Sequence, residues 1–94
     1  MKSASVIFGP DVDAAITLLI DYVDPSDIPT VIRFLERIQM RLVQTLSTLP
    51  EGGSRFQGNV RMMVVDKYTF LYEYHASKNE VHVLEMIAPG QDWR

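Results

Sequence analysis

Three arginines recur at every fourth position in the first half of the chain. In a helix, Arg33, Arg37 and Arg41 would form one basic stripe, because residues four apart lie on the same helical face. A guanidinium group binds a carboxylate through two parallel hydrogen bonds, so such a stripe could dock an acidic peptide. The alternative interpretation is a solvated helix edge that Glu36 partly neutralises.

A second group of basic residues, Arg55, Arg61 and Lys67, surrounds the start of a region rich in aromatic residues. These side chains could hold a phosphate group. They are interleaved with Glu51 and Asp66, however, which favours ordinary surface ion pairs.

Two histidines, His75 and His82, lie near Glu73, Glu80 and Glu85 in the sequence. Their spacing matches no short metal-binding motif, and both histidines flank a predicted turn. We therefore expect solvent-facing strand residues and no metal site.

Other patterns of catalytic residues are not visible. The sequence has no cysteine, which excludes disulfides and thiolate chemistry, and it lacks a nucleophile–base pair and a phosphate-binding glycine loop. Tyr68, Tyr72 and Tyr74 are more typical of core or rim aromatics than of catalysts. We predict no cofactor, and the residues alone indicate a small binding domain.

The composition is that of a folded protein. Its 94 residues suit one domain, which we predict to span residues 1–94, and 47% of them are hydrophobic. A net charge of −3 argues against autonomous binding of nucleic acid, which usually needs a basic face. No stretch approaches the roughly 20 apolar residues of a membrane span and no signal-peptide pattern is present, so we expect a cytoplasmic protein.

The elements that would position these residues follow from periodicity. Residues 4–8 are typical of a strand that stops at a Gly-Pro pair, and from Asp11 apolar residues recur at helical spacing as far as the segment YVDPSD. A second helix is predicted from Ile28 to Leu49, where proline and glycines follow. Because few residues join the two helices, they should form an antiparallel hairpin.

The second half predicts three strands. After a loop, EGGSRFQG, short connections join Asn59–Val65, Tyr68–His75 and Glu80–Ile87 into an antiparallel meander. The order is β-α-α-β-β-β, an α+β fold in which the helical hairpin covers one face of a small antiparallel sheet. Aromatic residues at every second position from Tyr68 to Tyr74 should share the covered face, and the opposite face is left partly open for a partner.

Several segments, taken in order, resemble the RelE/ParE superfamily of bacterial toxins from type II toxin–antitoxin systems. They span essentially the whole chain: GPDVDAAITLLIDYV, VIRFLERI, LSTLPEGG, VRMMVVDKYTFLYEY and EVHVLEMIAPGQDWR. The most specific parts are Arg61 at a strand start, Tyr68 with Leu71 and Tyr72, and the closing Gln-Asp-Trp-Arg. The resemblance implies the toxin fold, with the first strand beside the meander.

The superfamily divides by target, and the resemblance carries over residue by residue. RelE-like members cut messenger RNA on the ribosome with basic residues and often a tyrosine, whereas ParE-like members inhibit DNA gyrase. Of the nuclease set, Arg61 alone matches a basic position here. The Tyr-Arg of the third strand reads Tyr68-Thr69, and the basic residues after the last strand fall on Ala88-Pro89-Gly90. The loss of such charge-stabilising groups implies a feeble nuclease.

The resemblance therefore favours a ParE-like gyrase inhibitor of the plasmid-stabilisation type. It implies a cognate antitoxin that forms a hetero-oligomer with the toxin, laying a helix and an extended segment on the helical hairpin and the sheet. A RelE-like ribosome-dependent mRNA endoribonuclease and a degenerate relative that only binds its antitoxin are the alternatives. For Trp93, contact with the sheet or a partner and a frayed end are both open. The residues expected to contact the target or partner are Arg33, Arg37, Arg41, Arg61, Lys67, Tyr68, Tyr72, Trp93 and Arg94.

Overall fold

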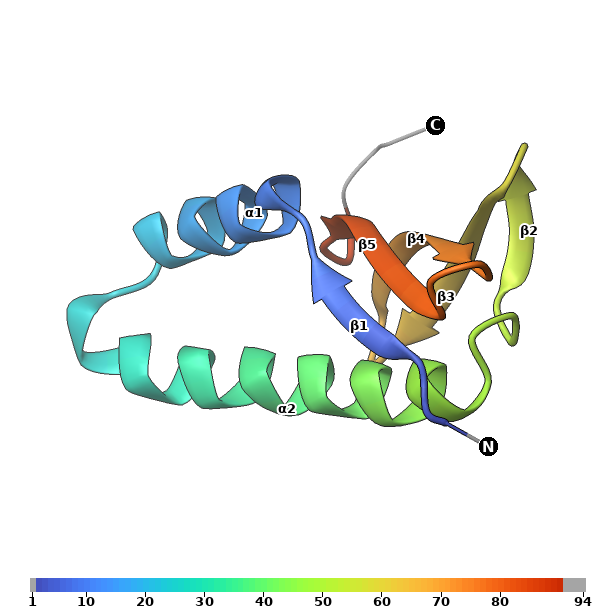
Figure 1. The fold of residues 1–94 in the computed structure, drawn as a ribbon. Helices are drawn as coiled ribbons and strands as arrows, with labels where there is room; N and C mark the ends of the chain where they lie inside the picture. Colours follow the sequence, from blue (N-terminus) through green and yellow to red (C-terminus); the bar gives the residue numbers. More distant parts are fainter. Residues whose placement is uncertain (1, 91–94) are drawn as a thin grey trace.

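A computed structural model describes residues 2–90 (Figure 1). Along the chain, two helices follow the first strand and precede the other four strands. The predicted α+β class and element order are confirmed, with one further strand and a short 3-10 helix. The elements are β1 (Ser5–Phe8), α1 (Pro10–Asp21), η1 (Pro25–Asp27), α2 (Ile28–Thr48), β2 (Ser54–Gln57), β3 (Val60–Val65), β4 (Tyr68–His75) and β5 (Glu80–Ile87).

The strands form one five-stranded sheet in the order β1-β5-β4-β3-β2. The predicted meander is antiparallel, and β1 lies beside it as expected. The sheet as a whole is mixed, because β1 pairs with β5 in parallel, from Ser5 opposite Glu80 to Phe8 opposite Val83.

The segment predicted as a loop before the meander contains β2, and this part of the prediction was wrong. The four residues of β2 are all exposed, and no alternation of apolar and polar side chains marks them as a strand. Pairing with β3 makes them one, with Arg55 opposite Arg61. Gly58, with a positive φ of 56°, lies in the turn that reverses the chain into β3.

The core lies between α2 and the inner face of the sheet, the face on the side of the helices. Leu35, Ile38, Leu42 and Leu46 are the buried residues of α2, and they recur at helical spacing. Opposite them, the predicted aromatic row of β4 supplies two fully buried rings, Phe70 and Tyr72, and two partly buried ones at its ends. The aromatic face was therefore predicted correctly.

The two helices cover the same face of the sheet and run in opposite directions (Figure 1). α1 packs against β5, whereas α2 contacts β1 and β3. The predicted apolar stripe of α2 is longer than its buried part, since Ile32 and Leu49 near the two ends are 39% and 60% exposed. No helix in residues 2–90 is both long and apolar enough to cross a bilayer.

Replacing Leu42 by alanine tests the dependence of the fold on this core. Leu42 is fully buried in the contact between α2 and the sheet, so Leu42→Ala should lower the free energy of unfolding by about 2–5 kcal/mol. Met40→Ala on the same helix is the control, because Met40 is 62% exposed and its loss should change stability by less than about 0.5 kcal/mol. Urea denaturation followed by circular dichroism measures both, and equal effects would contradict the packing described.

Candidate functional site

The predicted contact residues fall into two groups on different parts of the molecule. Arg33, Arg37 and Arg41 form the first, which we call the α2 basic strip. Lys67 and Tyr68 lie at its end, at the turn between β3 and β4. Arg61 and Tyr72 form the second group, below the loop from α2 to β2. Trp93 and Arg94 lie outside the described residues.

The arginines of the α2 basic strip differ in what they contact. Arg41 donates from Nη1 to both carboxylate oxygens of Asp66, at 3.0 and 2.8 Å. Arg33 donates from Nε only to the carbonyl of Pro29 on its own helix, at 3.4 Å. Arg37 has no partner among the described residues. Two of the three guanidinium groups are therefore free to bind carboxylates of another molecule.

An aromatic pair flanks the strip. The rings of Phe34 and Tyr68 meet edge to face with centroids 5.9 Å apart. Phe34 lies three residues before Arg37 and so on the same side of the helix. Cations beside a partly exposed aromatic pair suit an acidic segment that also carries apolar side chains.

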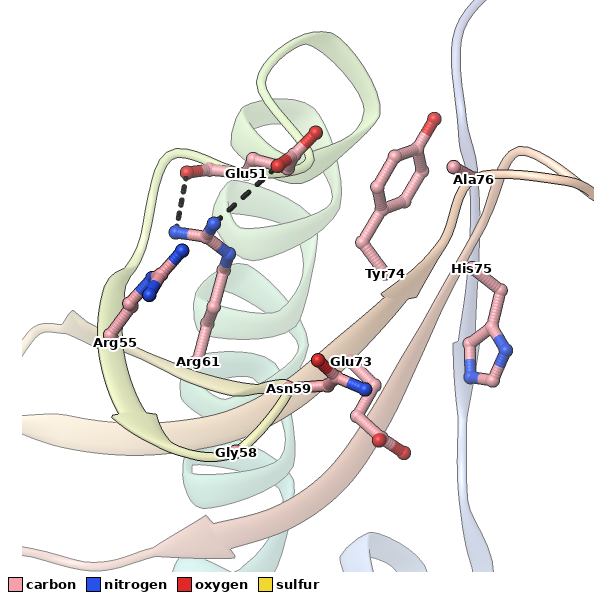
Figure 2. A pocket seen from close by; sticks show the side chains of 9 residues that line it. All are labelled: Glu51, Arg55, Gly58, Asn59, Arg61, Glu73, Tyr74, His75 and Ala76. Carbon is pink, nitrogen blue, oxygen red and sulfur yellow. Dashed lines mark hydrogen bonds and ion pairs between the residues drawn. The ribbon is translucent and has the colours of Figure 1, made fainter.

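Arg61 is held by the chain itself rather than presented to solvent. Its Nη1 donates to the carbonyls of Glu51 and Gly53 at 3.2 and 3.0 Å, and its Nη2 lies 3.4 Å from the Glu51 carboxylate (Figure 2). Only 21% of the side chain is exposed. Arg61 therefore fixes the loop between α2 and β2, which is a structural role.

Tyr72 acts on the same loop from the other side. The Gly53 N–H donates to the Tyr72 hydroxyl at 2.8 Å, and a Cβ on Gly53 would lie only 2.6 Å from that oxygen, so glycine is required there. Burial raises the pKa of Tyr72, although the Gly53 hydrogen bond and the Arg61 charge oppose the shift. Arg61 and Tyr72, two of the predicted contact residues, thus form one cluster at paired positions of β3 and β4.

A polar hollow of about 370 Å³ lies beside this cluster (Figure 2). Arg55 and Arg61 line one side of it, and Glu73, Tyr74 and His75 line the other. Arg55 has no partner among the described residues, so the hollow offers one unpaired cation to a small anion. The Tyr74 hydroxyl is already engaged, because it donates to Asn79 at 2.8 Å.

The histidines face away from the helices. The rings of His75 and His82 are in contact, with centroids 4.4 Å apart and planes tilted by 56°, and His82 Nε2 lies 3.0 Å from the Glu80 carboxylate. Across residues 2–90, no three His, Cys, Asp or Glu side chains are arranged to hold a metal ion. This ring contact was not predicted, because it depends on the register between β4 and β5.

The positions of the nuclease set do not converge. Arg61 is paired with Tyr72 on the inner face, whereas Thr69 is paired with Val64 on the opposite, outer face. Side chains on opposite faces of a sheet point away from each other. Ala88-Pro89-Gly90, directly after β5, adds no charge.

Sequence reasoning missed the apolar character of the outer face. Val60, Met62 and Val64 of β3 point to this face, beside Leu71 of β4. The signal was present in the run VRMMVV, which has apolar residues on both sides of the strand instead of alternation.

Comparison with known proteins identifies the architecture. No protein-family model matches the chain, and no curated protein matches its sequence. The isolated RelE toxin of E. coli superposes with a TM-score of 0.59 at 13% identity, covering 96% of this chain and 88% of RelE. This chain has the RelE/ParE toxin fold.

Two toxin–antitoxin complexes contain chains with the same fold. A chain of the chromosomal ParDE system of P. aeruginosa has a TM-score of 0.70 at 13% identity and covers 93% of this chain and 97% of its own. A chain of the RelBE2 complex of Mycobacterium tuberculosis has a TM-score of 0.63 at 15% identity, with 97% of both chains covered. The RelE/ParE fold thus extends over nearly the whole chain.

Removal of the Tyr72 hydroxyl tests the loop cluster. Tyr72→Phe leaves the Gly53 N–H without its acceptor, so stability at pH 7 should fall by about 1 kcal/mol. Burial raises the pKa of Tyr72 in the folded state, so the neutral hydroxyl is the form that the fold favours. Its contribution to stability is complete below the ordinary pKa of 10.0 and is lost progressively as the pH rises above that value. The stability gap between wild type and Tyr72→Phe should therefore narrow above pH 10.0.

Urea denaturation between neutral pH and about pH 11 measures this gap, a range set by the ordinary tyrosine pKa. Tyr22→Phe is the matched control, because Tyr22 is 85% exposed. A gap that stays constant across the range, or an equal effect of the control, would show that the Tyr72 hydroxyl does not serve the loop.

Proposed function

We propose that this chain is the toxin of a type II toxin–antitoxin pair and that it inhibits DNA gyrase in the cytoplasm without cutting RNA. Its RelE/ParE fold, shared with the isolated RelE toxin, supports the toxin role. The proposed ParE-like activity is supported by two positions that correspond to the nuclease set: Arg61 and Thr69 point to opposite faces of the sheet.

The observation that carries the proposal is the engagement of Arg61. A nuclease needs cations that reach the charge developing on the scissile phosphate, and loss of one such donor costs about a hundredfold or more in rate. Arg61 donates its hydrogen bonds to Glu51 and Gly53 and lies on the inner face of the sheet. The outer face offers Thr69 at the other nuclease position. A binding mode of inhibition needs none of these groups.

A ribosome-dependent endoribonuclease is the second candidate, and one observation favours it. Arg55 lies opposite Arg61 across β2 and β3, and its guanidinium group faces the polar hollow without a partner among the described residues (Figure 2). Arg55 could thus hold one phosphate of a bound RNA. The candidate remains weaker, because Glu51 and Glu73 line the same hollow and repel phosphate.

The partner that we propose is a cognate antitoxin with an acidic segment that lies along the α2 basic strip. Arg33 and Arg37 have no carboxylate partner among residues 2–90, and the Phe34–Tyr68 pair beside them offers an apolar contact. The complex would be a hetero-oligomer. The acidic segment itself would lie on the helical side of the sheet.

The gyrase proposal predicts a direct effect of the purified chain. It should block supercoiling and cause cleaved DNA to accumulate in a gyrase assay. Arg55→Ala should inhibit gyrase within about twofold of wild type, because the Arg55 side chain is exposed and has no partner among the described residues. Ribosome-bound messages should show no cuts by primer extension. Message cleavage that Arg55→Ala abolishes would establish the nuclease instead, and normal growth with soluble protein would indicate a degenerate relative.

The antitoxin proposal predicts an effect of charge on the strip. Arg33→Glu combined with Arg37→Glu should weaken binding of the antitoxin about tenfold or more, because like charges would then oppose each other. The ligand is the proposed cognate antitoxin, to be sought as an acidic protein encoded by a gene beside that of this chain, and titration calorimetry gives the affinity. Arg55→Glu with Lys78→Glu makes the same change in net charge elsewhere and should leave the affinity unchanged. Equal losses in both variants would remove the strip from the interface.

A further inference from the structure

The outer face of the sheet, turned away from the helices, has an apolar centre. Outward positions on all five strands contribute to it, and Leu71 and Ile87 are almost fully buried there by their neighbours. Others remain open to solvent: Val64 is 57% exposed, Ile7 42% and Phe56 40%. No element among the described residues covers this face.

A bulge between β4 and β5 deepens the centre into a hollow. The register shifts after Leu71, so Leu84 and Glu85 both line the outer face instead of alternating. The resulting hollow is about 490 Å³ in volume, with Phe56, Leu71 and Leu84 among its apolar lining residues. An apolar side chain of another molecule fits such a space.

The formally charged side chains at the outward strand positions around this apolar centre are all acidic, although Arg55 lines the polar hollow that Glu73 also borders. Asp11 and Glu85 border the hollow, and Glu73 and Glu80 lie at outward positions of β4 and β5. Glu80 contacts His82, whereas the other three carboxylates have no partner among the described residues. The outward positions of the described strands carry no lysine or arginine.

This combination selects one class of occupant. Nucleic acid is disfavoured, because three unpaired carboxylates would oppose its phosphates. A second copy of this chain would place the same acidic rim against itself across a two-fold axis. An acidic antitoxin segment is drawn instead to the α2 basic strip, which lies on the helical side.

We infer that the outer face is a docking surface for a basic amphipathic segment of another protein, separate from the partner of the α2 basic strip. Apolar side chains of that segment would enter the hollow between Phe56, Leu71 and Leu84, and its lysines or arginines would pair with Glu73, Glu85 and Asp11. The inference goes beyond the proposed gyrase inhibition and does not depend on it.

The test uses the purified full chain and three synthetic peptides of equal length: alternating lysine and leucine, alternating lysine and serine, and alternating glutamate and leucine. Fluorescence anisotropy gives the affinities, and two-dimensional NMR locates the perturbed amides. The lysine–leucine peptide should bind at least tenfold more tightly than the other two, and it should perturb β3, β4 and β5 rather than α2.

Two double variants of equal charge change identify the site. Glu73→Lys with Glu85→Lys should weaken binding of the lysine–leucine peptide at least tenfold. Asp21→Lys with Glu36→Lys, both at exposed helical positions, should leave it within about twofold. Circular dichroism checks that each variant is folded, and Glu85→Gln alone, at an exposed residue, provides a milder variant with the same direction of effect.

Four results would overturn the inference. These are equal weakening by both double variants, equal binding of the lysine–serine peptide, outer-face NMR changes caused by single-stranded RNA, and outer-face changes that grow with protein concentration in the absence of peptide. The first two would mean diffuse charge attraction, the third a nucleic-acid surface and the fourth a self-association surface. Because no assay here involves gyrase, failure of the gyrase proposal would leave the result intact.

Discussion

The packing of the buried α2 side chains against the inner face of the sheet is the interaction on which the other elements depend. Ile38, Leu42 and Leu46 are fully buried with Phe70 and Tyr72 in one core, and each such side chain contributes about 1.5–3 kcal/mol when it is buried. This contact fixes which side of α2 faces solvent and which face of the sheet stays uncovered. The two proposed binding surfaces are thus consequences of one packing arrangement.

The two surfaces have opposite charge and lie on opposite sides of the sheet. Arginines gather on α2, whereas the outer face of the strands carries only carboxylates among its charged side chains within the described residues. A chain with a net charge of −3 thereby presents a basic and an acidic surface on different sides. Arg61, the one residue that matches a basic position of the nuclease set, belongs to neither surface and instead holds the loop that follows α2.

Much of the fold follows from local patterns in the sequence. The apolar spacing of α2 and the aromatic row of β4 predict their buried sides, and the two-residue turn Asp66-Lys67 sets the register that places Arg61 opposite Tyr72. The remaining features depend on distant pairing. β2 becomes a strand only through its contact with β3, and the bulge at Leu84 shifts the later register by one residue. The acidic outer face could be assembled only once that register was known.

The overhang of α2 beyond the sheet gives this helix two parts of unequal stability. The segment from Leu35 to Leu46 rests on the core, whereas Ile32 and Phe34 before it are 39% and 38% exposed. Hydrogen bonds without tertiary packing open more readily, so backbone amides of the first turns should exchange with solvent faster than those over the core. Arg33 projects from this less protected part. A ligand bound there would restrict the opening of these turns, and part of its interaction energy would be lost as conformational entropy.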